Sequence, residues 1–318
     1  MAVYTQVPAE ALAAFLTRFD AGELVSAKGI AEGVENSNYL VDTTTGRYLL
    51  TLYEKRVEAG DLPFFFALLD HLAARGNPVP PAITDREGRI IHTLQGRPAA
   101  LIRFLPGVSV SDPTPAQVRA VGAAMAQMHA SLAEFTPERP NSLGVAAWRP
   151  LLEQCGPDLA KIAPGLYARV DEALARVEGG WPHHLPRLAI HADLFPDNVL
   201  MLGDEVAGLI DFYFACTDVR ALDLAISHSA WSFDATGTPL SPMIGRALIE
   251  GYASAHPLSD EERAALPVLA AGACIRFLLT RAWDWLNTPA DALVTRKDPL
   301  AYLRRLDWYE AHGPEAFA

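Results

Sequence analysis

The amino-acid sequence predicts an α+β protein of two unequal lobes: a small N-terminal lobe built on an antiparallel β-sheet, and a larger, mainly helical C-terminal lobe. Residues 24–104 hold short β-rich runs separated by turn-forming residues. Proline and glycine then interrupt the chain between 105 and 113. Beyond residue 114, apolar residues recur mostly at helical spacing. We therefore expect lobes at 1–104 and 114–318, a linker at 105–113, and a ligand-binding cleft between the lobes.

The small lobe is expected to begin with a short helix and to continue mainly as strands. Tyr, Val, Thr and Leu fill 39–41 and 48–53 as β-rich runs, and turn-forming residues separate the two runs. A helix follows at 62–75, because its apolar residues recur every three or four positions, and Gly76 ends it. Two further strands are predicted after a turn: 89–93 and 99–104.

The large lobe is predicted to open with a capped helix. Thr114 and Gln117 have the spacing of a capping box, and Pro115 suits the first helical turn. A β-type pattern interrupts the helical part at 188–215, and the chain is helical again to about residue 309. The lobe is therefore expected to be helical around a small β unit.

The composition excludes several classes of protein. The net charge of −12 is unsuited to gripping a nucleic-acid backbone, which needs clustered basic residues. The three cysteines have no paired spacing, so neither a disulfide framework nor a zinc site is expected. The sequence shows no secretory signal and no apolar run long enough to span a bilayer. We expect a cytoplasmic protein with neither a nucleic-acid nor a membrane partner.

The segment from 191 to 214 carries the candidate chemistry. A short apolar strand at 188–190 delivers Asp193 to its end, and Asn198 follows a proline. A hairpin is predicted next, with strands at 199–202 and 206–210 and a two-residue Gly-Asp turn. Asp211 stands where the return strand ends, so the hairpin should bring it back beside Asp193 and Asn198.

These three oxygen-bearing side chains suit phosphoryl transfer. Mg²⁺ is a hard ion that prefers carboxylate and carbonyl oxygens, so Asn198 and Asp211 are the candidate metal ligands, together with ATP phosphates. Asp193 is then left to orient an acceptor hydroxyl and accept its proton. Few other groups are needed, because such catalysis depends mainly on positioning and on neutralising phosphate charge.

The same residues carry a family resemblance. His191, Asp193, Asn198 and Asp211-Phe212 follow the protein-kinase signature, in which Asn lies five residues after the Asp of the catalytic loop. The short hairpin before the second Asp resembles the aminoglycoside phosphotransferase-like small-molecule kinases. More narrowly, six segments spread over the chain resemble the homoserine kinases of that fold: YLLTLYEKR, DLPFF, HADLFPDNVL, GLIDFYFAC, FLLTRAWDWL and KDPLAYLRRL.

The resemblance covers roughly residues 4–309 and implies a bilobal protein-kinase-like fold. It implies a nucleotide-binding N-terminal lobe, a catalytic and substrate-binding C-terminal lobe, and ATP and Mg²⁺ as cofactors. The implied reaction is the ATP-dependent phosphorylation of L-homoserine to O-phospho-L-homoserine in threonine biosynthesis. Neither composition nor spacing indicates homoserine independently.

The loop at 29–38 is the candidate cover for the nucleotide phosphates, with Gly33, Asn36 and Asn38 as its contacts. An ordinary polar hairpin is the alternative. Related kinases carry a Lys or Arg on the third strand for the phosphates, whereas alignment of that strand puts Thr51 here.

Ile102 and Phe104 lie in the strand that would bind adenine through its backbone. The alternative for this strand is simply a place in the core, and the two roles are compatible because a backbone contact leaves little side-chain signature. Adenine binding at Ile102 and Phe104 is therefore expected from the resemblance rather than from the residue types.

Candidate contacts to the acceptor come from two segments. His191 and Asp193 lie at the end of the strand, where His191 is expected to orient the loop by hydrogen bonding. Arg276 or Arg281 could hold a substrate carboxylate, because arginine presents a planar fork of donors; the alternative is a surface ion pair with Asp284. Asp223 is expected to cap its helix or to tether the loop.

Several functions stay open at this stage. Another kinase substrate, such as choline, ethanolamine, a sugar or an aminoglycoside, keeps the same chemistry, and choline would require an aromatic cage. A metal-dependent hydrolase built on His191, Asp193 and Asp211 would need further histidine ligands. A non-catalytic nucleotide-binding module is the third alternative, which the missing strand lysine favours. The expected assembly is a monomer or a weak homo-oligomer.

Overall fold

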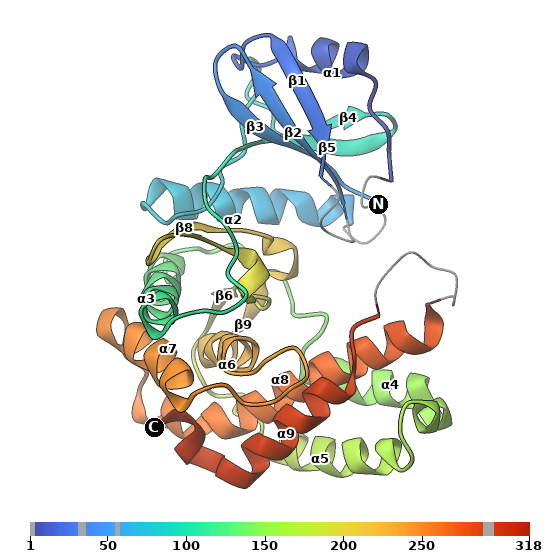
Figure 1. Cartoon of the computed structure of the whole chain (residues 1–318), viewed down its shortest axis with the longest axis vertical. Helices are drawn as coiled ribbons and strands as arrows, with labels where there is room; N and C mark the ends of the chain where they lie inside the picture. The colour runs from blue at the N-terminus through green and yellow to red at the C-terminus, as the bar shows by residue number, and fades with distance from the viewer. Residues whose placement is uncertain (1–3, 31–35, 55–57, 289–295) are drawn as a thin grey trace. The chain divides into compact units, whose positions relative to one another are not determined.

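The computed structural model describes residues 4–30, 36–54, 58–288 and 296–318. The chain divides into two compact units, Met1–Gly107 and Val108–Ala318, which we call unit 1 and unit 2 (Figure 1). Each unit is described by itself below.

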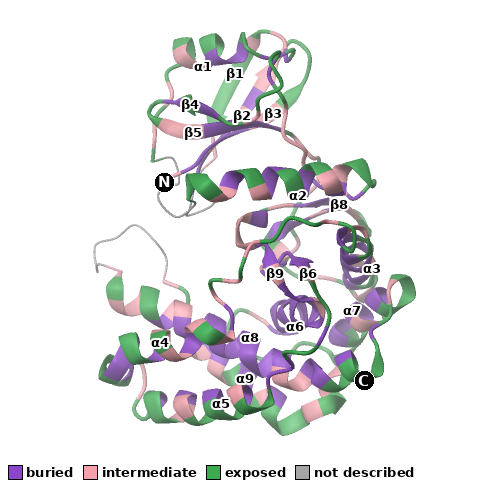
Figure 2. Ribbon diagram, turned by 180° about the vertical axis from the view of Figure 1, so that it is seen from behind, coloured by how far each residue is buried: buried purple, intermediate pink, exposed green. Residues whose placement is uncertain are grey.

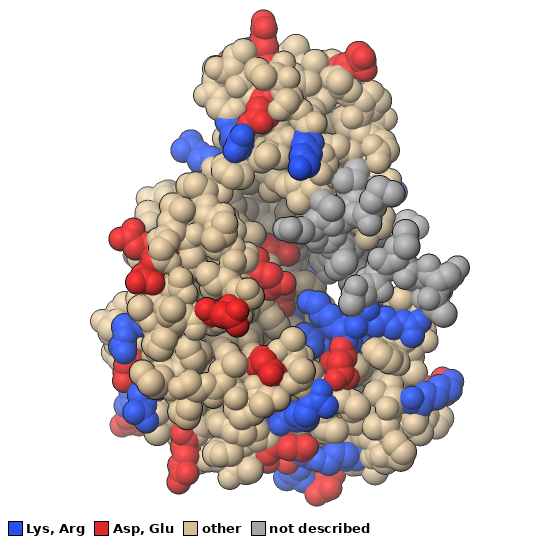
Figure 3. Space-filling view, in the orientation of Figure 1, with Lys and Arg blue, Asp and Glu red and all other residues tan. Residues whose placement is uncertain are grey.

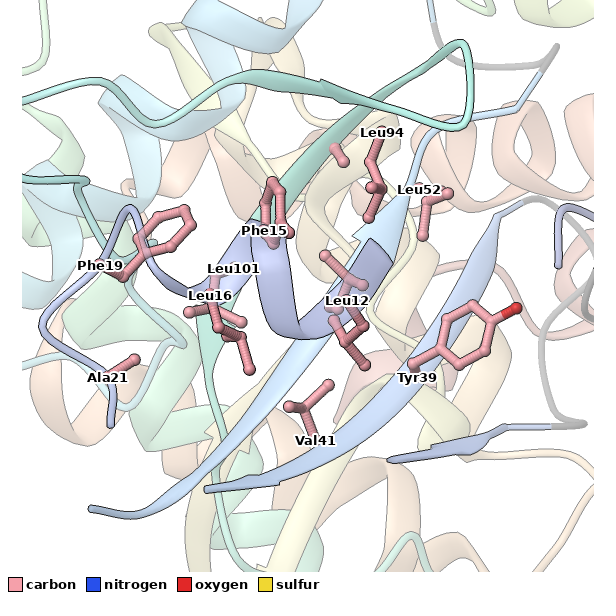
Figure 4. Packing of buried hydrophobic residues seen from close by; sticks show 12 residues of the cluster. Leu12, Phe15, Leu16, Phe19, Ala21, Tyr39, Val41, Leu52, Leu94 and Leu101 are labelled. Carbon is pink, nitrogen blue, oxygen red and sulfur yellow. The ribbon is translucent and has the colours of Figure 1, made fainter. Parts of the chain in front are cut away.

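Unit 1 contains the antiparallel sheet that the sequence predicts; it has five strands in the order β1-β2-β3-β5-β4. Helix α1 packs on this sheet, and Leu12, Phe15 and Leu16 from the helix meet Val41 and Leu101 from the strands (Figure 4). The elements of unit 1 are α1 (Ala9–Leu16), β1 (Leu24–Gly29), β2 (Ser37–Thr43), β3 (Arg47–Leu52), η1 (Ala59–Asp61), α2 (Leu62–Ala74), β4 (His92–Leu94) and β5 (Arg97–Arg103).

One strand of unit 1 lies later in the chain than the sequence indicates. The expected strand at 89–93 is a three-residue strand at 92–94, because the turn before it is longer. The carboxylate of Asp85 accepts hydrogen bonds from the backbone N–H groups of Glu87 (2.9 Å) and Arg89 (2.8 Å). These bonds hold the backbone through Arg89 in a turn that sheet pairing would break.

Unit 2 is mainly helical. Helix α6 is buried from its second residue, Ala221, to its end and lies at the centre of the unit (Figure 2). The helices of unit 2 are α3 (Pro115–Leu132), α4 (Val145–Cys155), α5 (Leu166–Gly180), α6 (Arg220–Trp231), α7 (Pro242–Ala255), α8 (Asp260–Asn287) and α9 (Leu300–His312), with 3-10 turns η2 (Gly156–Lys161), η3 (Pro196–Asn198), η4 (Phe212–Phe214) and η5 (Gly313–Phe317). Its strands form two antiparallel pairs, β6 (Arg187–Ile190) with β9 (Cys216–Val219) and β7 (Val199–Leu202) with β8 (Glu205–Leu209).

The capping box that opens unit 2's first helix is confirmed. The Thr114 hydroxyl accepts from the Gln117 N–H (3.2 Å), and the Gln117 side chain accepts from the Thr114 N–H (3.0 Å). Two orphan donors of the helix start are thereby satisfied. The helix then packs so tightly on α7 that a Cβ at Gly122 would lie 2.2 Å from the carbonyl oxygen of Leu248. Glycine is therefore needed at this crossing.

Acidic and basic side chains are interspersed over the face of unit 2 drawn in Figure 3. Many of them pair. Arg169 of α5 contacts Asp307 (2.5 Å) and Glu310 (2.7 Å) of α9, and Arg176 contacts Glu310 (2.7 Å). These ion pairs join α5 to α9 at the surface.

Helix α8 corrects one expectation from the sequence. By length and composition it contains a window that could cross a membrane, although 67% of that window is buried inside the protein. It contacts α4, α5, α6 and α9. The apolar composition of α8 is therefore that of a core helix of unit 2.

Candidate active site

The predicted hairpin of unit 2 is confirmed. Its strands meet with Leu202 opposite Glu205, which leaves Gly203-Asp204 as the two-residue turn. Gly203 has a φ of +64°, a left-handed conformation that glycine adopts without steric cost. The return strand is 205–209, one residue earlier than expected. Asp211 follows just beyond it.

Hydrogen bonds gather the loop at 191–198 and the end of the hairpin. The Asn198 amide donates to the carbonyl oxygen (2.8 Å) and to the carboxylate (3.3 Å) of Asp193. The Ile210 N–H donates to the carbonyl oxygen of Asn198 (3.0 Å), and His191 Nε2 donates to the carbonyl oxygen of Ile210 (3.0 Å). Asp211 therefore directly follows Ile210, whose backbone is hydrogen-bonded to both Asn198 and His191.

The orientation of Asn198 fits a metal ligand. Its amide nitrogen is committed to Asp193, so the amide oxygen is the atom left for another partner. Asp211 is exposed and has a φ of +65°, a conformation that aspartate adopts more readily than most residues. An amide oxygen and a carboxylate are hard donors that suit Mg²⁺ when phosphate oxygens complete its coordination.

No self-contained metal cluster is found in the part of the chain that the structure describes, since no three His, Cys, Asp or Glu side chains lie together as ligands. The hydrolase alternative required such a cluster around His191. A site of two protein ligands plus nucleotide phosphates does not require one.

A buried carboxylate anchors the start of the loop. Asp223 of α6 accepts hydrogen bonds from the backbone N–H groups of His191 (2.8 Å) and Ala192 (2.7 Å). Ala192 has a φ of +62°, which costs an alanine about 1–2 kcal/mol. The two bonds to Asp223 hold the backbone in this conformation, so the tethering role expected of Asp223 is confirmed.

Asp223 is itself held by two further side chains. His129 Nε2 lies 3.0 Å from the Asp223 carboxylate, and His129 Nδ1 lies 2.8 Å from the Tyr252 hydroxyl. Burial opposes the charge on Asp223, but the hydrogen bond and charge of His129, with the backbone donors, hold the pKa of Asp223 below its usual value. The carboxylate is therefore kept as an ionised acceptor.

His191 is fully enclosed, and both of its ring nitrogens bond within the protein. Nε2 donates to Ile210, and Nδ1 accepts from the Asp193 N–H (3.3 Å). Burial lowers the pKa of His191, although Asp223 opposes this shift. A neutral ring with the proton on Nε2 satisfies both contacts, which agrees with the orienting role expected of His191.

Two more side chains hold the loop. Arg276 of α8 donates through Nη1 to the Ala192 carbonyl (2.6 Å), and Trp231 of α6 donates to the Leu194 carbonyl (2.9 Å). Both peptide groups that flank Ala192 are thus fixed by buried donors or acceptors. The sequence did not indicate either contact, because the partners lie 84 and 37 residues apart along the chain.

Arg281, the other candidate for a substrate carboxylate, lies one turn further along α8. Its guanidinium lies over the Tyr302 ring, 4.5 Å from the centroid, and makes a long 3.5 Å hydrogen bond to the carbonyl oxygen of Asp298. The alternative of an ion pair with Asp284 is not among the contacts of Arg281 within the described residues. The contact with Tyr302, which α9 supplies, was not predicted from the sequence.

The residues expected to bind the nucleotide lie in unit 1. Asn36 and Asn38 are both held by the sheet: the Asn36 side chain accepts from the Glu54 N–H (3.3 Å), and the Asn38 side chain accepts from the Thr51 hydroxyl (2.8 Å). Thr51 lies on β3, as the alignment places it. Gly33 lies outside the described residues.

The two residues of the expected adenine-binding strand have different surroundings. Ile102 is buried on β5. Its backbone pairs with Leu49 of β3 and, through an isolated bridge, with Ala82. Phe104 follows the strand, and the Arg47 guanidinium lies 5.4 Å from its ring centroid. Ile102 is thus a core residue. The contact with adenine expected of its backbone stays a prediction.

Comparison with known proteins places the chain in a family. Residues 26–258 match the model of the phosphotransferase enzyme family. A homoserine kinase of Methylobacterium sp. (strain 4-46) is 54% identical over 309 residues, which are 97% of this chain and 96% of the relative. A homoserine kinase of Gluconobacter oxydans (strain 621H) is 53% identical over 98% of this chain and 99% of the relative.

Solved structures agree on the fold. An amicoumacin kinase is similar with a TM-score of 0.71 at 15% identity, over 95% of this chain and 93% of that one. Spectinomycin phosphotransferase APH(9)-Ia gives a TM-score of 0.69 at 14% identity, over 98% and 100% of the two chains. The expected α+β fold of the protein-kinase-like class is therefore confirmed. From the matched family model and the full-length relatives together, the chain belongs to the phosphotransferase enzyme family, among its homoserine kinases.

Proposed function

We propose that this protein transfers the γ-phosphoryl group of ATP to the hydroxyl of L-homoserine and so forms O-phospho-L-homoserine for threonine biosynthesis. The observation that carries the proposal is the identity of more than half the residues, over nearly the full length, with proteins named homoserine kinase. An ATP-dependent phosphotransferase that acts on a hydroxyl group is the class to which the family belongs.

Asp193 is proposed as the catalytic base. It is half-buried at the end of β6, and its carboxylate accepts from the Asn198 amide. From there it would orient the acceptor hydroxyl and take its proton as the new bond to phosphorus forms. The contacts of Asp223 and Arg276 to Ala192 serve this step, since they fix the backbone beside the base.

Asn198 and Asp211 are the proposed ligands of Mg²⁺. When bound there, the ion would neutralise charge on the nucleotide phosphates. Asn198 would have two tasks, because its amide nitrogen holds Asp193 while its oxygen faces the ion.

ATP binding by unit 1 stays a prediction for five residues: Gly33, Asn36, Asn38, Ile102 and Phe104. The predictions of a cytoplasmic location, of no nucleic-acid or membrane partner, and of a monomer or weak homo-oligomer also stand as proposals. His191 is proposed to position the loop rather than to contact the substrate, because its ring nitrogens are both engaged.

An acceptor panel with an Asp193→Asn variant tests the proposed function. Phosphorylated product is measured with ATP, Mg²⁺ and either L-homoserine, choline, ethanolamine or an aminoglycoside. We expect turnover on L-homoserine, and a loss of about 10²–10⁴-fold in kcat for Asp193→Asn with ATP affinity retained. Asp197→Asn is the matched control, because Asp197 is exposed in the same loop.

Two results would contradict this proposal. Efficient turnover of another acceptor with none of L-homoserine would reject the substrate. Full activity of Asp193→Asn would reject the base.

A further inference from the structure

Three arginines that gather around the same aromatic rings of unit 2 have no acidic partner within the described residues. Arg276 and Arg281 of α8 and Arg305 of α9 form no ion pair with a carboxylate within the residues that the structure describes. Arg276 and Arg305 bond only to backbone carbonyl oxygens, as in the contacts of Arg305 to Ser229 (2.9 Å) and Asp234 (2.8 Å). By contrast, the arginines between α5 and α9 at the surface pair with two carboxylates each.

The three guanidinium groups surround a pair of stacked aromatic rings. Arg281 and Arg305 lie 4.5 Å and 4.3 Å from the Tyr302 ring centroid, and Arg276 lies 4.6 Å from that of Phe277. The Tyr302 and Phe277 rings stack with centroids 5.0 Å apart and an interplanar angle of 26°. Cationic groups over ring faces are favourable, but neutral rings leave the net positive charge in place.

This region also holds polar atoms that lack partners. Tyr302 is fully buried and Arg276 and Arg305 are 4% exposed. Within the described residues, the Tyr302 hydroxyl and the Nε atoms of both arginines have no hydrogen-bond partner. Buried donors without acceptors are costly, and so are buried charges without counter-charges. The cluster of Arg276, Arg281, Arg305 and Tyr302 is therefore incomplete without an anion.

The cluster borders the proposed base. Arg276 bonds to the carbonyl of Ala192, and the ring of the next residue, Phe277, meets the ring of Phe195 at 5.0 Å. Burial lowers the pKa of Arg281, and the charge of Arg305 lowers it further, whereas the charge of Asp193 raises it. Arg281 is thus within electrostatic reach of Asp193, and it is the partly exposed member of the cluster that a substrate can approach.

We propose that Arg281, supported by the Tyr302 hydroxyl, binds the carboxylate of the acceptor and so restricts the reaction to amino-acid alcohols. This inference rests on the proposed function. An acceptor with a hydroxyl at one end and a carboxylate at the other would present the first to Asp193 and the second to Arg281. Arg276 is then a positioning residue of the 191–198 loop rather than a substrate contact.

Paired acceptors test this assignment. L-Homoserine is compared with 3-aminopropan-1-ol, which has the same chain without the carboxylate. In Arg281→Met we expect kcat/KM for L-homoserine to fall by about 100-fold or more, chiefly through KM, because a contact made equally before and during reaction affects binding. For 3-aminopropan-1-ol the change should be less than about threefold. Arg263→Met is the control, because Arg263 is an exposed residue of the same helix, paired with Asp260.

Two further variants separate binding from positioning. Tyr302→Phe keeps the ring and removes the hydroxyl, so KM for L-homoserine should rise about 5–10-fold with kcat retained. Arg276→Met should instead lower kcat for both acceptors alike, because it loosens the loop beside the base. If Arg281→Met does not fold, Tyr302→Phe decides the test.

A binding measurement covers the case in which the wild type does not use 3-aminopropan-1-ol. L-2-Aminobutyrate keeps the carboxylate but has no hydroxyl, so it should inhibit competitively against L-homoserine, with a Ki that rises about 100-fold in Arg281→Met. An unchanged Ki would overturn the assignment. An equal loss of kcat on both acceptors would also overturn it, since Arg281 would then act on the transferred phosphate.

A wild type inactive on L-homoserine but active on other alcohols rejects the proposed function itself. If only the assignment of Arg281 to the carboxylate is wrong, the wild type is still active on L-homoserine. The two failures are therefore distinguishable.

Discussion

Replacement of Asp223 by asparagine should weaken unit 2 and slow catalysis together. The substitution keeps the size of the side chain and one acceptor oxygen. It removes the charge, however, and turns an amide N–H₂ toward one of the two backbone donors that Asp223 now satisfies, the N–H groups of His191 and Ala192. His129 loses its carboxylate partner as well.

The expected loss of stability follows from these contacts. A hydrogen bond to a charged group contributes about 1.5–3 kcal/mol, and a buried donor left without an acceptor costs about 1–3 kcal/mol. Together they give a loss of about 3–5 kcal/mol, within the total of about 5–15 kcal/mol typical of a domain. For domains of this size the melting temperature should fall by roughly 10 °C.

The expected loss of activity follows from the position of Ala192. Without its tether the left-handed residue can relax, and Asp193 moves with it. A displacement of about 1 Å can cost about 100-fold in rate, so kcat should fall by about 10–100-fold while the affinity for ATP changes little.

Thermal unfolding and steady-state kinetics on one preparation measure both effects. Asp158→Asn is the control, because Asp158 is exposed and pairs only with Lys161 across one helical turn; its effect should stay within about 0.5 kcal/mol. A normal melting temperature and kcat in Asp223→Asn would refute the reasoning. A lower melting temperature with normal kcat would show that Asp223 stabilises the unit without positioning the base.

Three further predictions follow from other contacts. Asp211→Asn should raise the Mg²⁺ concentration for half-maximal activity by at least about tenfold, measured by metal titration. Gly122→Ala should lower the free energy of unfolding by about 3 kcal/mol, because its Cβ would lie 2.2 Å from a backbone oxygen; Gly179→Ala, with no atom within 4 Å, should raise it by about 0.5–1 kcal/mol in the same urea titrations. Burial lowers the pKa of His228 from 6.5 to about 3, and lowers that of His191. The unfolded chain therefore binds more protons below pH 6.5, so stability should decrease as the pH is lowered. His228 should contribute about 1.4 kcal/mol per pH unit, and His191 should act in the same direction; a flat profile in urea titrations from pH 6.5 to 4 would contradict this.

The parts of the fold that the sequence predicted depend on short-range signals. The capping box at Thr114 spans three residues, and the Gly203-Asp204 turn is defined by the two short strands on either side. The hydrogen bond from the Ile210 N–H to the carbonyl oxygen of Asn198, just before Asp211, follows from that hairpin. Each signal acts within about a dozen residues, where backbone preferences are strong.

The contacts that hold the 191–198 loop in place could not be predicted in the same way. His129 and Tyr252 meet across 123 residues, and Arg276 and Ala192 across 84. Alanine has no preference for the left-handed conformation that Ala192 adopts, since tertiary contacts impose it. Arg281 was identified as a candidate by its chemistry, but its surroundings, which include no acidic partner among the described residues, are visible only once α9 is packed against α8.

The loop that carries the proposed base is held from α6 and α8, whereas α9 supplies the aromatic ring beneath Arg281. Tyr302 makes no hydrogen bond to the loop within the described residues. Under the proposed assignment, substitutions on this face of α9 alter which alcohols are accepted while the proposed base keeps its place. Such separation allows one reaction to be retained while substrate preference diverges among related enzymes.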